Sequence, residues 1–317
     1  MKRPMRDLSF EAVLLDTSEW TCLELHGDDR LEWLQGQATN DVRGLTPGKS
    51  LSFCLCEPNG SLLAVLDAWA LEDRILLTTA RELEQAVLDR VERMTILEDV
   101  TAVVSSKFLV SIQGVGVDQA LGELFELPSA EAGTVRLQDG GVFALRSRRT
   151  SAGGWDLWAD STLANEIAQR FPEASVEDYE AERIVAGIPK WGVDMGPKTL
   201  APELGPDFEA RHISYQKGCY TGQEVLMRIH SRGHTNKTWV GLLASSPVPL
   251  GASVEHDGKS VGMVSSSAAS PSSPGFIAAA TLRNEAAQEG EQVTVGGVEA
   301  TVRPFPLARD ASRSRGL

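Results

Sequence analysis

The sequence contains few cysteines and no long apolar run. Only four of its 317 residues are cysteine, and positions 22, 54, 56 and 219 are too scattered for a disulfide framework. No apolar stretch approaches the roughly 20 residues of a membrane span. No apolar segment follows the basic N-terminus, where a secretory signal would have one. We therefore expect a cytoplasmic protein with free thiols and no membrane partner.

Basic residues are also scarce. The chain has 30 Lys and Arg against 44 Asp and Glu, which gives a net charge of −14. A general nucleic-acid binder needs a net basic face for the phosphates, so no direct nucleic-acid partner is expected. The length suggests about two domains at ~150 residues each.

Apolar periodicity predicts a mixed fold in the first part of the chain. Strands are expected at 50–55 and 62–70, on either side of a turn at 57–60. Helices are expected at 81–94 and 176–188, the second ended by Gly187 and Pro189. Because strands and helices are mixed without regular βαβ units, the predicted class is α+β.

The pattern changes after Thr238. Pro-, Gly- and Ser-rich turns separate six short apolar stretches, which predict strands of a small β-barrel or sandwich. The stretches lie at 239–243, 252–254, 260–264, 276–280, 292–295 and 299–302. We therefore divide the chain into an α+β region at 1–237, a β-barrel at 238–310 and a tail at 311–317.

Three short motifs do not support the functions that they first suggest. Gly114-Val115-Gly116 lacks the third small residue of a dinucleotide fingerprint, because Gln119 stands there. Gly48-Lys49-Ser50 lacks the first glycine of a P-loop. Cys54 and Cys56 share one face of a strand, but no second Cys or His cluster lies nearby, so they are interpreted as core residues. No metal site is expected.

Residues 211–237 form a basic island in this acidic chain. They contain five Lys or Arg and one acid, a local sum of +4. The five are Arg211, Lys217, Arg228, Arg232 and Lys237, and the acid is Glu224. Such an island is a candidate site for an anionic ligand, and a solvated basic face is the alternative.

Within the island, residues 217–224 read Lys-Gly-Cys-Tyr-Thr-Gly-Gln-Glu. Thr221 and Glu224 have the spacing of a capping box, which predicts a helix that starts at Thr221. Cys219 would then lie in the positive end of the helix dipole, with Lys217 two residues away, and both effects favour the thiolate. From these residues alone, Cys219 is either a reactive thiol or a packed cysteine.

Residues 217–224 resemble the signature of the YgfZ-type folate-binding proteins, relatives of the glycine-cleavage T-protein (aminomethyltransferase). Residues 34–42 resemble the N-terminal signature of the same family, and residues 183–189 resemble its helix before the motif. The Pro202-Glu203 turn and the β-rich C-terminal part also fit. The resemblance implies two α+β lobes and a C-terminal β-barrel in a ring-like arrangement, with tetrahydrofolate or another reduced folate near the centre.

The chain departs from the T-protein pattern at the positions of two acidic residues of the T-protein site. Its catalytic aspartate corresponds to about Ala64 and Val65, and Asp67 is out of register, which predicts a carboxylate on the wrong face of the strand. Its folate-holding glutamate corresponds to Val185. Lost acids and a gained Cys219 are typical of the YgfZ branch, which is implicated in making or maintaining iron–sulfur enzymes.

The resemblance therefore implies a folate-binding accessory protein for iron–sulfur cluster assembly or repair, with iron–sulfur client or assembly proteins as partners. The alternative is a folate-dependent aminomethyltransferase or other one-carbon transferase, for which the sequence places no base in the pocket. A non-classical accessory protein is favoured over a glycine-cleavage enzyme.

The resemblance also suggests site residues. Cys219 and Lys217 are the catalytic candidates. The cofactor-binding candidates are Asn40, Asp41, Thr79, Arg183, Gln223, Glu224 and Arg228. Lys217, Arg183 and Arg228 are expected to hold the carboxylates or the pterin edge of folate. Asn40, Asp41 and Gln223 are expected to form hydrogen bonds in the central pocket, and Thr79 replaces a pterin-side asparagine of the T-protein.

Overall fold

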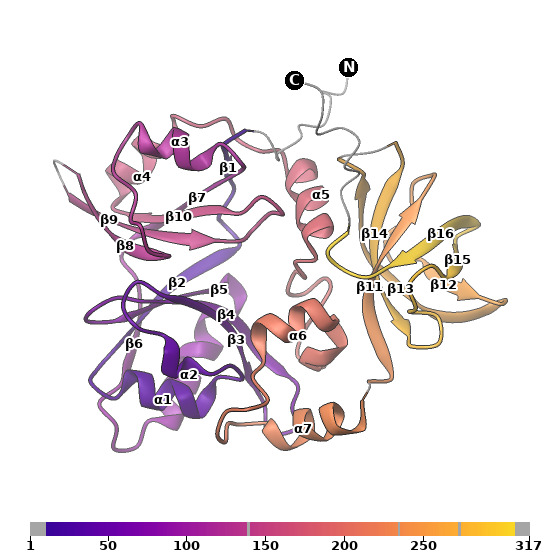
Figure 1. Cartoon of the computed structure of the whole chain (residues 1–317), viewed down its shortest axis with the longest axis horizontal. Helices are drawn as coiled ribbons and strands as arrows, with labels where there is room; N and C mark the ends of the chain where they lie inside the picture. The colour runs from indigo at the N-terminus through magenta and orange to yellow at the C-terminus, as the bar shows by residue number, and fades with distance from the viewer. Residues whose placement is uncertain (1–10, 138–139, 234, 272–273, 308–317) are drawn as a thin grey trace.

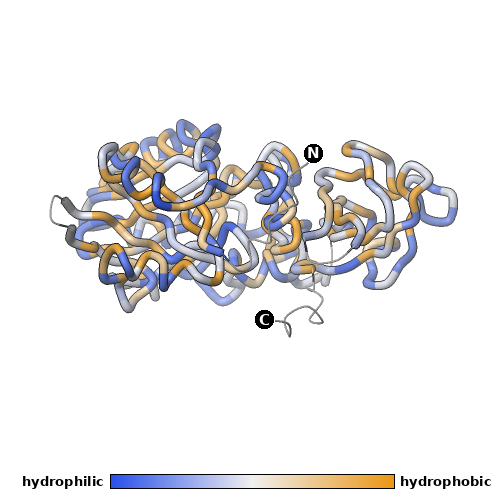
Figure 2. Tube along the Cα trace, turned by 90° about the horizontal axis from the view of Figure 1, so that it is seen from above, coloured by the Kyte–Doolittle hydropathy of each residue, from blue (hydrophilic) through white to orange (hydrophobic). Residues whose placement is uncertain are grey.

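A computed structural model describes residues 11–137, 140–233, 235–271 and 274–307. In this part of the chain, two five-stranded sheets and a closed barrel are joined by a helical segment (Figure 1). Seen from above, the two lobes lie at one end of a flattened molecule and the barrel at the other (Figure 2). The tail expected at 311–317 lies outside the described residues. No helix in the described ranges is long and apolar enough to cross a membrane.

The first lobe is an antiparallel sheet with two helices on one face. The strand order is β3-β4-β5-β2-β6. The strands are β2 (Trp20–His26), β3 (Ser50–Cys56), β4 (Leu62–Ala70), β5 (Ile75–Ala80) and β6 (Thr101–Val104). Helices α1 (Arg30–Gln37) and α2 (Glu84–Met94) pack on one face, with short 3-10 turns at Val42–Gly44 and Arg81–Leu83.

Strand β4 shows how this sheet separates a core from a site. Side chains alternate between the two faces of a strand. Ala64, Leu66 and Ala68 are buried in the core beneath α1 and α2. Val65 and Asp67 therefore project from the opposite face, toward the rest of the molecule.

The second lobe is an antiparallel sheet with the order β1-β7-β10-β9-β8. Its strands are β1 (Val13–Leu15), β7 (Phe108–Gln113), β8 (Ala132–Leu137), β9 (Gly140–Ser147) and β10 (Gly154–Ala159). Helices α3 (Val117–Gly122) and α4 (Ser161–Ala168) contribute to its core. The lobes meet at an apolar contact that includes Trp69 and Trp158.

A helical segment connects the lobes to the barrel. It contains α5 (Val176–Ala186), a 3-10 turn at Ala201–Leu204, α6 (Pro206–His212) and α7 (Gln223–Arg232). Helix α5 ends as predicted, because Gly187 adopts the left-handed conformation at φ 66° that terminates many helices. Its residues Ala181, Ile184 and Val185 pack against Ile277 and Leu307 of the barrel end of the chain.

The C-terminal strands close into a barrel with the order β11-β14-β13-β12-β15-β16. They are β11 (Lys237–Ala244), β12 (Ser253–His256), β13 (Lys259–Ala269), β14 (Phe276–Arg283), β15 (Gln292–Val295) and β16 (Val298–Arg303). Each of the six predicted strands is present. Closure pairs every edge of the sheet, so no strand of the barrel is left open for aggregation. The predicted α+β class with a C-terminal β-barrel is confirmed.

Candidate functional site

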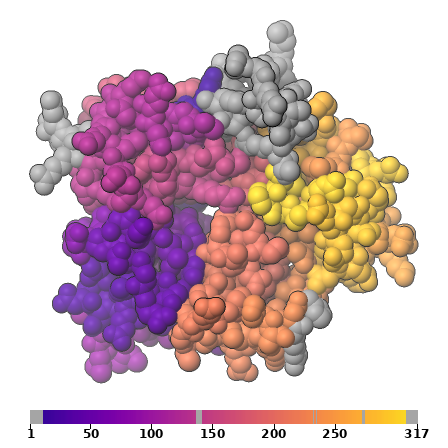
Figure 3. All heavy atoms as spheres, viewed as in Figure 1, coloured from indigo at the N-terminus to yellow at the C-terminus, as the bar shows by residue number. Residues whose placement is uncertain are grey.

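A cavity of about 750 Å³ lies where the two lobes meet the helical segment. Its wall combines β3, β4 and β5, the end of β9, one face of α5 and part of α6. Figure 3 shows the molecule hollowed at this junction. The volume is within the ~300–1,000 Å³ range of small-molecule sites.

Aromatic side chains form part of the wall. Trp20 and Tyr179 meet edge to face, with ring centroids 5.8 Å apart, and Trp191 lines the same space. The guanidinium of Arg149 lies 4.1 Å from the centroid of Trp20. Phe208 stacks on His212 at 3.8 Å. Flat aromatic surfaces of this kind suit a ligand that itself carries rings.

Seven basic side chains line the cavity, and most of them are already neutralised. They are Arg81, Arg146, Arg148, Arg149, Arg183, Lys190 and Arg211. Five of them have a carboxylate oxygen within 2.8 Å. Arg81 instead donates to the backbone carbonyls of Ser18 and Trp20.

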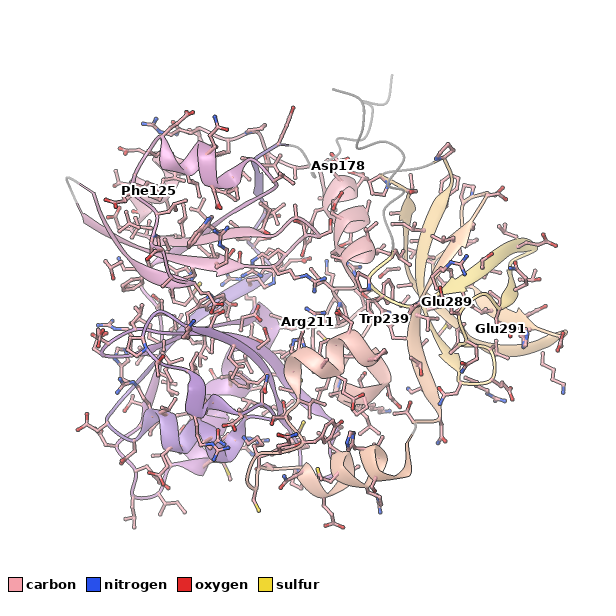
Figure 4. The ribbon with its side chains drawn as sticks, in the orientation of Figure 1. Phe125, Asp178, Arg211, Trp239, Glu289 and Glu291 are labelled. Atoms are coloured by element: carbon pink, nitrogen blue, oxygen red, sulfur yellow. The ribbon has the colours of Figure 1, made fainter. Side chains whose placement is uncertain are left out.

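Arg148 is the lining cation that has only a distant carboxylate. Its Nη1 lies 4.0 Å from Asp207 Oδ2, and that oxygen is only 2.6 Å from Arg211 Nη2. Its Nη2 donates to the carbonyl of Ala186 at 2.8 Å. The side chain is 36% exposed, so it can offer a positive charge to an anion inside the cavity. Figure 4 labels Arg211 beside this space, where α6 faces the lobes.

His212 is a buried, neutral imidazole in the cavity wall. Its Nδ1 lies 2.8 Å from the carbonyl oxygen of Phe208, which can only accept, so Nδ1 carries the proton. Burial lowers the pKa of His212 to about 4. The ring is therefore uncharged at neutral pH, and Nε2 is a hydrogen-bond acceptor.

Asp67 lines the cavity, which corrects the sequence-based register. The prediction placed its carboxylate on the wrong face of the strand, but β4 turns the side chain toward the cavity beside Ser52. The prediction was wrong because it measured the register from Ala64, which lies three residues before Asp67 and faces the core. Val65 lies two residues before Asp67 and faces the same side as Asp67, because the strand period is two.

Lys217 does not line the cavity, contrary to its expected role. Its side chain is 6% exposed, and Nζ donates to the backbone carbonyls of Gln35, Ala38 and Asn40 at 2.7, 2.5 and 3.1 Å. Nζ also lies 5.0 Å from the centroid of Tyr220. Burial lowers the pKa of Lys217 to about 8, so the group is still an ammonium at pH 7. Its three hydrogen bonds therefore join residues 217–224 to residues 34–42, the two segments that resemble the family signatures.

Asn40 and Asp41 are also engaged within the protein and do not line the cavity. Asn40 Nδ2 donates to the carbonyls of Ser52 and Arg211 at 2.9 and 2.8 Å. Asp41 binds Arg43 at 2.5 Å and accepts from Gln35 Nε2 at 3.1 Å. The side-chain groups of Asn40 and Asp41 that were predicted to bind folate thus form their hydrogen bonds within the protein.

The remaining motif residues lie at the start of α7, outside the cavity lining. Helix α7 begins at Gln223, and Gly222, with φ 85°, is its N-cap. No side chain caps this helix, so the capping box predicted for Thr221 and Glu224 is wrong. Glu224 and Arg228 are exposed to solvent. Gln223 Nε2 makes one long hydrogen bond, 3.4 Å, to the carbonyl of Gly218.

Two of the predicted cofactor-binding residues do line the cavity. Thr79 lines the cavity, and its Oγ1 donates to the carbonyl of Val65 at 2.9 Å. Arg183 is 1% exposed and bound to Glu180 and Asp194 at 2.6 and 2.7 Å. Its charge is therefore compensated before any ligand enters.

The four cysteines differ sharply in their surroundings. Cys219 is exposed in the loop before α7, and Cys22, Cys54 and Cys56 are buried on β2 and β3. Burial raises the pKa of all three buried thiols, that of Cys56 to about 12. The packed-cysteine alternative for Cys219 does not fit its exposure.

Five cavity residues were not predicted from the sequence, namely Trp20, Arg148, Tyr179, Trp191 and His212. One signal was present for Arg148, because residues 146–149 read Arg-Ser-Arg-Arg, a cluster of three basic side chains. The other four lie in separate segments with no shared spacing. Only the fold brings them together.

Comparisons with known proteins relate this architecture to a known fold. Residues 237–307 match the glycine cleavage T-protein C-terminal barrel domain. The whole structure is similar to the crystal structure of glycine cleavage system aminomethyltransferase T from Bartonella henselae. The TM-score is 0.82 at 20% sequence identity, and the match covers 95% of this chain and 87% of that chain. At this identity the likeness shows the fold.

Relatives in sequence span most of the chain. The tRNA-modifying protein YgfZ of Enterobacter sp. (strain 638) is 27% identical over 251 residues, which are 77% of this chain and 76% of the relative. The Shigella dysenteriae protein of the same name is 28% identical over 256 residues, with the same coverage. A chloroplast protein of Arabidopsis thaliana, whose transferase name is provisional, is 26% identical over 306 residues, 90% of this chain and 68% of the relative. Together, the barrel domain, the fold and these relatives confirm the resemblance drawn from the sequence, that of a YgfZ-type protein with the fold of the glycine-cleavage T-protein.

Proposed function

We propose that this chain is a cytoplasmic folate-binding accessory protein for iron–sulfur cluster assembly or repair. The observation that carries the proposal is the central cavity, which combines aromatic walls with two incompletely neutralised cations, Arg81 and Arg148, inside a T-protein fold. Tetrahydrofolate has two ring systems and a glutamate tail, and both features find suitable partners there.

The residues that would hold a reduced folate follow from this chemistry. Trp20, Tyr179 and Trp191 offer surfaces to the pterin and benzoyl rings. Arg148 offers a charge-assisted hydrogen bond to a glutamate carboxylate. When bound, a reduced folate supplies a carrier for one-carbon groups. Thr79 adds a hydroxyl to the same wall.

Cys219 is assigned a separate role, because it lies outside the cavity lining. An exposed thiol near a helix N-terminus can attack or ligate as a thiolate. One thiolate does not hold a cluster that usually takes four ligands, so any cluster contact would be shared with a client or assembly protein. The YgfZ relatives carry the name tRNA-modifying protein. We propose that this chain supports such modification through iron–sulfur enzymes and does not itself contact RNA.

Two measurements test this function. Calorimetry with 5-formyltetrahydrofolate, a stable reduced folate, should give saturable binding that weakens with salt, because the carboxylate contact is screened. Cys219→Ser should keep that affinity and fail to support iron–sulfur enzyme activity in a deletion strain. Absence of both heat and thermal shift with reduced folates would contradict folate binding. A fully active Ser variant would remove the thiol from the function.

The second candidate is a folate-dependent one-carbon transferase. Asp67 favours it, because a transferase needs an anionic or basic group in the pocket and this carboxylate faces the cavity. Aminomethyl transfer measured beside a T-protein control distinguishes the two candidates. Robust turnover that is lost in Asp67→Asn would favour the transferase.

A further inference from the structure

Asp67 differs from the other acids of the cavity wall. Glu19 binds Lys190 at 2.7 Å, and Glu82 lies on the exposed turn before α2. Asp67 projects from the middle of the sheet and, within the described residues, has no Lys, Arg or His nitrogen within 4.0 Å. An incompletely paired carboxylate inside a cavity is available to a ligand that donates hydrogen bonds.

The sheet fixes the position of this carboxylate. Asp67 is paired in register with Ser52 on β3 and with Thr78 on β5, and both neighbours line the cavity. Ser52 Oγ donates to Oδ1 at 2.5 Å. Oδ2 makes no hydrogen bond with the described part of the chain, so one oxygen is oriented by the protein and the other is free to accept. A site on paired strands is also more rigid than one on a loop.

The charged and polar side chains near Asp67 leave its carboxylate able to accept hydrogen bonds from a ligand. Arg148 and Arg149 both interact electrostatically with Asp67, but neither forms an ion pair with it within 4.0 Å. Arg149 is bound instead to the fully buried Asp156 at 2.5 Å. His212 is neutral because of its burial. At position 185, where the T-protein resemblance has a folate-holding glutamate, Val185 packs into the apolar contact with the barrel. Asp67 is therefore the carboxylate of this wall that can meet the donor edge of a ring ligand.

We propose that Asp67 determines specificity for the pterin of the bound folate, by accepting hydrogen bonds from its ring N–H and exocyclic amino groups. This inference rests on the proposed folate binding. A site built to accept from such donors discriminates strongly against ligands that lack them, since an unpaired buried acceptor is costly. Arg148 would hold the carboxylate tail, so the two residues recognise opposite chemistry.

The test compares two ligands that share the tail and differ in the pterin. Calorimetry measures 5-formyltetrahydrofolate and p-aminobenzoylglutamate against the full chain, Asp67→Asn, and the matched control Glu92→Gln, an exposed acid-to-amide change on α2. We expect Asp67→Asn to weaken the folate at least tenfold and to leave p-aminobenzoylglutamate within twofold. Glu92→Gln should change neither. Retained binding of the fragment shows that the variant is folded.

The other outcomes separate the two proposals. Unchanged folate affinity in Asp67→Asn overturns the role of Asp67 and leaves folate binding in place. Equal weakening of both ligands also overturns it, because the residue would then shape the cavity and not read the pterin. If the unmodified chain binds neither ligand, the proposed function fails, and this inference fails with it.

Discussion

Replacing Lys217 with methionine removes the ammonium that joins the two signature segments and keeps a side chain of similar length. The carbonyl oxygens of Gln35, Ala38 and Asn40 lose their shared donor. The bond to Ala38 is buried and those to Gln35 and Asn40 are partly buried, so each carbonyl left without its partner is assigned about 1 kcal/mol, the low end of the range. Three of them predict a loss of about 3 kcal/mol in the free energy of unfolding, a large fraction of a typical total.

Urea denaturation followed by tryptophan fluorescence measures this loss. The m-value should stay the same, so that the shift in midpoint reports stability alone. Lys49→Met is the matched control, because Lys49 is exposed and its ammonium makes no hydrogen bond within the described residues. A change within about 0.5 kcal/mol is expected there.

The reasoning would be refuted by a Lys217→Met variant with the stability of the unmodified chain. If that variant also lost affinity for 5-formyltetrahydrofolate, Lys217 would act on the ligand, as the sequence analysis predicted. If stability falls and the folded variant still binds folate, the residue is a structural clamp between segments.

Three further results are expected. Iodoacetamide at pH 7.5 should modify the native chain once, at Cys219, because burial raises the pKa of the other three thiols, and mass spectrometry showing two or more adducts before unfolding would contradict this. Burial lowers the pKa of His212 from 6.5 to about 4. Between pH 6.5 and pH 4, the imidazole therefore binds a proton more readily in the unfolded chain than in the folded one. The contribution of His212 to the free energy of unfolding should therefore fall by about 2 kcal/mol from pH 7 to pH 5, and urea titrations of His212→Gln should lack this part of the fall. Gly222→Ala should cost about 2 kcal/mol or more in thermal melts, because its φ is 85° and a Cβ would lie 2.6 Å from the carbonyl of Glu57, whereas Gly218→Ala, with open space around it, should change little.

The barrel and helix α5 could be predicted because their signals are local. Alternating apolar residues between turn residues define strands, and Gly187 at the end of an apolar helical face defines a C-terminus. The start of α7 could not be predicted in this way. Thr221 and Glu224 match a capping box, but Gly222 is pressed against the β3–β4 turn, and this long-range contact decides where the helix begins.

The candidate site was predicted only in part for a related reason. The spacing of residues 217–224 identified Cys219 as an unusual thiol, and its exposure depends on the loop in which it lies. The partners of Lys217 are backbone carbonyls, which every residue carries, so no sequence pattern indicates them. The cavity wall combines short pieces of several distant segments, and single positions such as Arg148 or Asp67 reveal their role only when the register of each strand is known.

The clamp at Lys217 also sets an order of events during synthesis. Its three carbonyl acceptors precede it by 177 to 182 residues. At roughly 5–20 residues per second, translation leaves the loop at 35–40 without its ammonium for about 10 to 35 seconds after the loop has been made. The first lobe can form its sheet during this interval, but the loop gains its final partner only when the second signature segment has emerged. A chain that ends before residue 217 would therefore leave these three carbonyls to water, and the loop at 35–40 would lack the ammonium that fixes it in the complete protein.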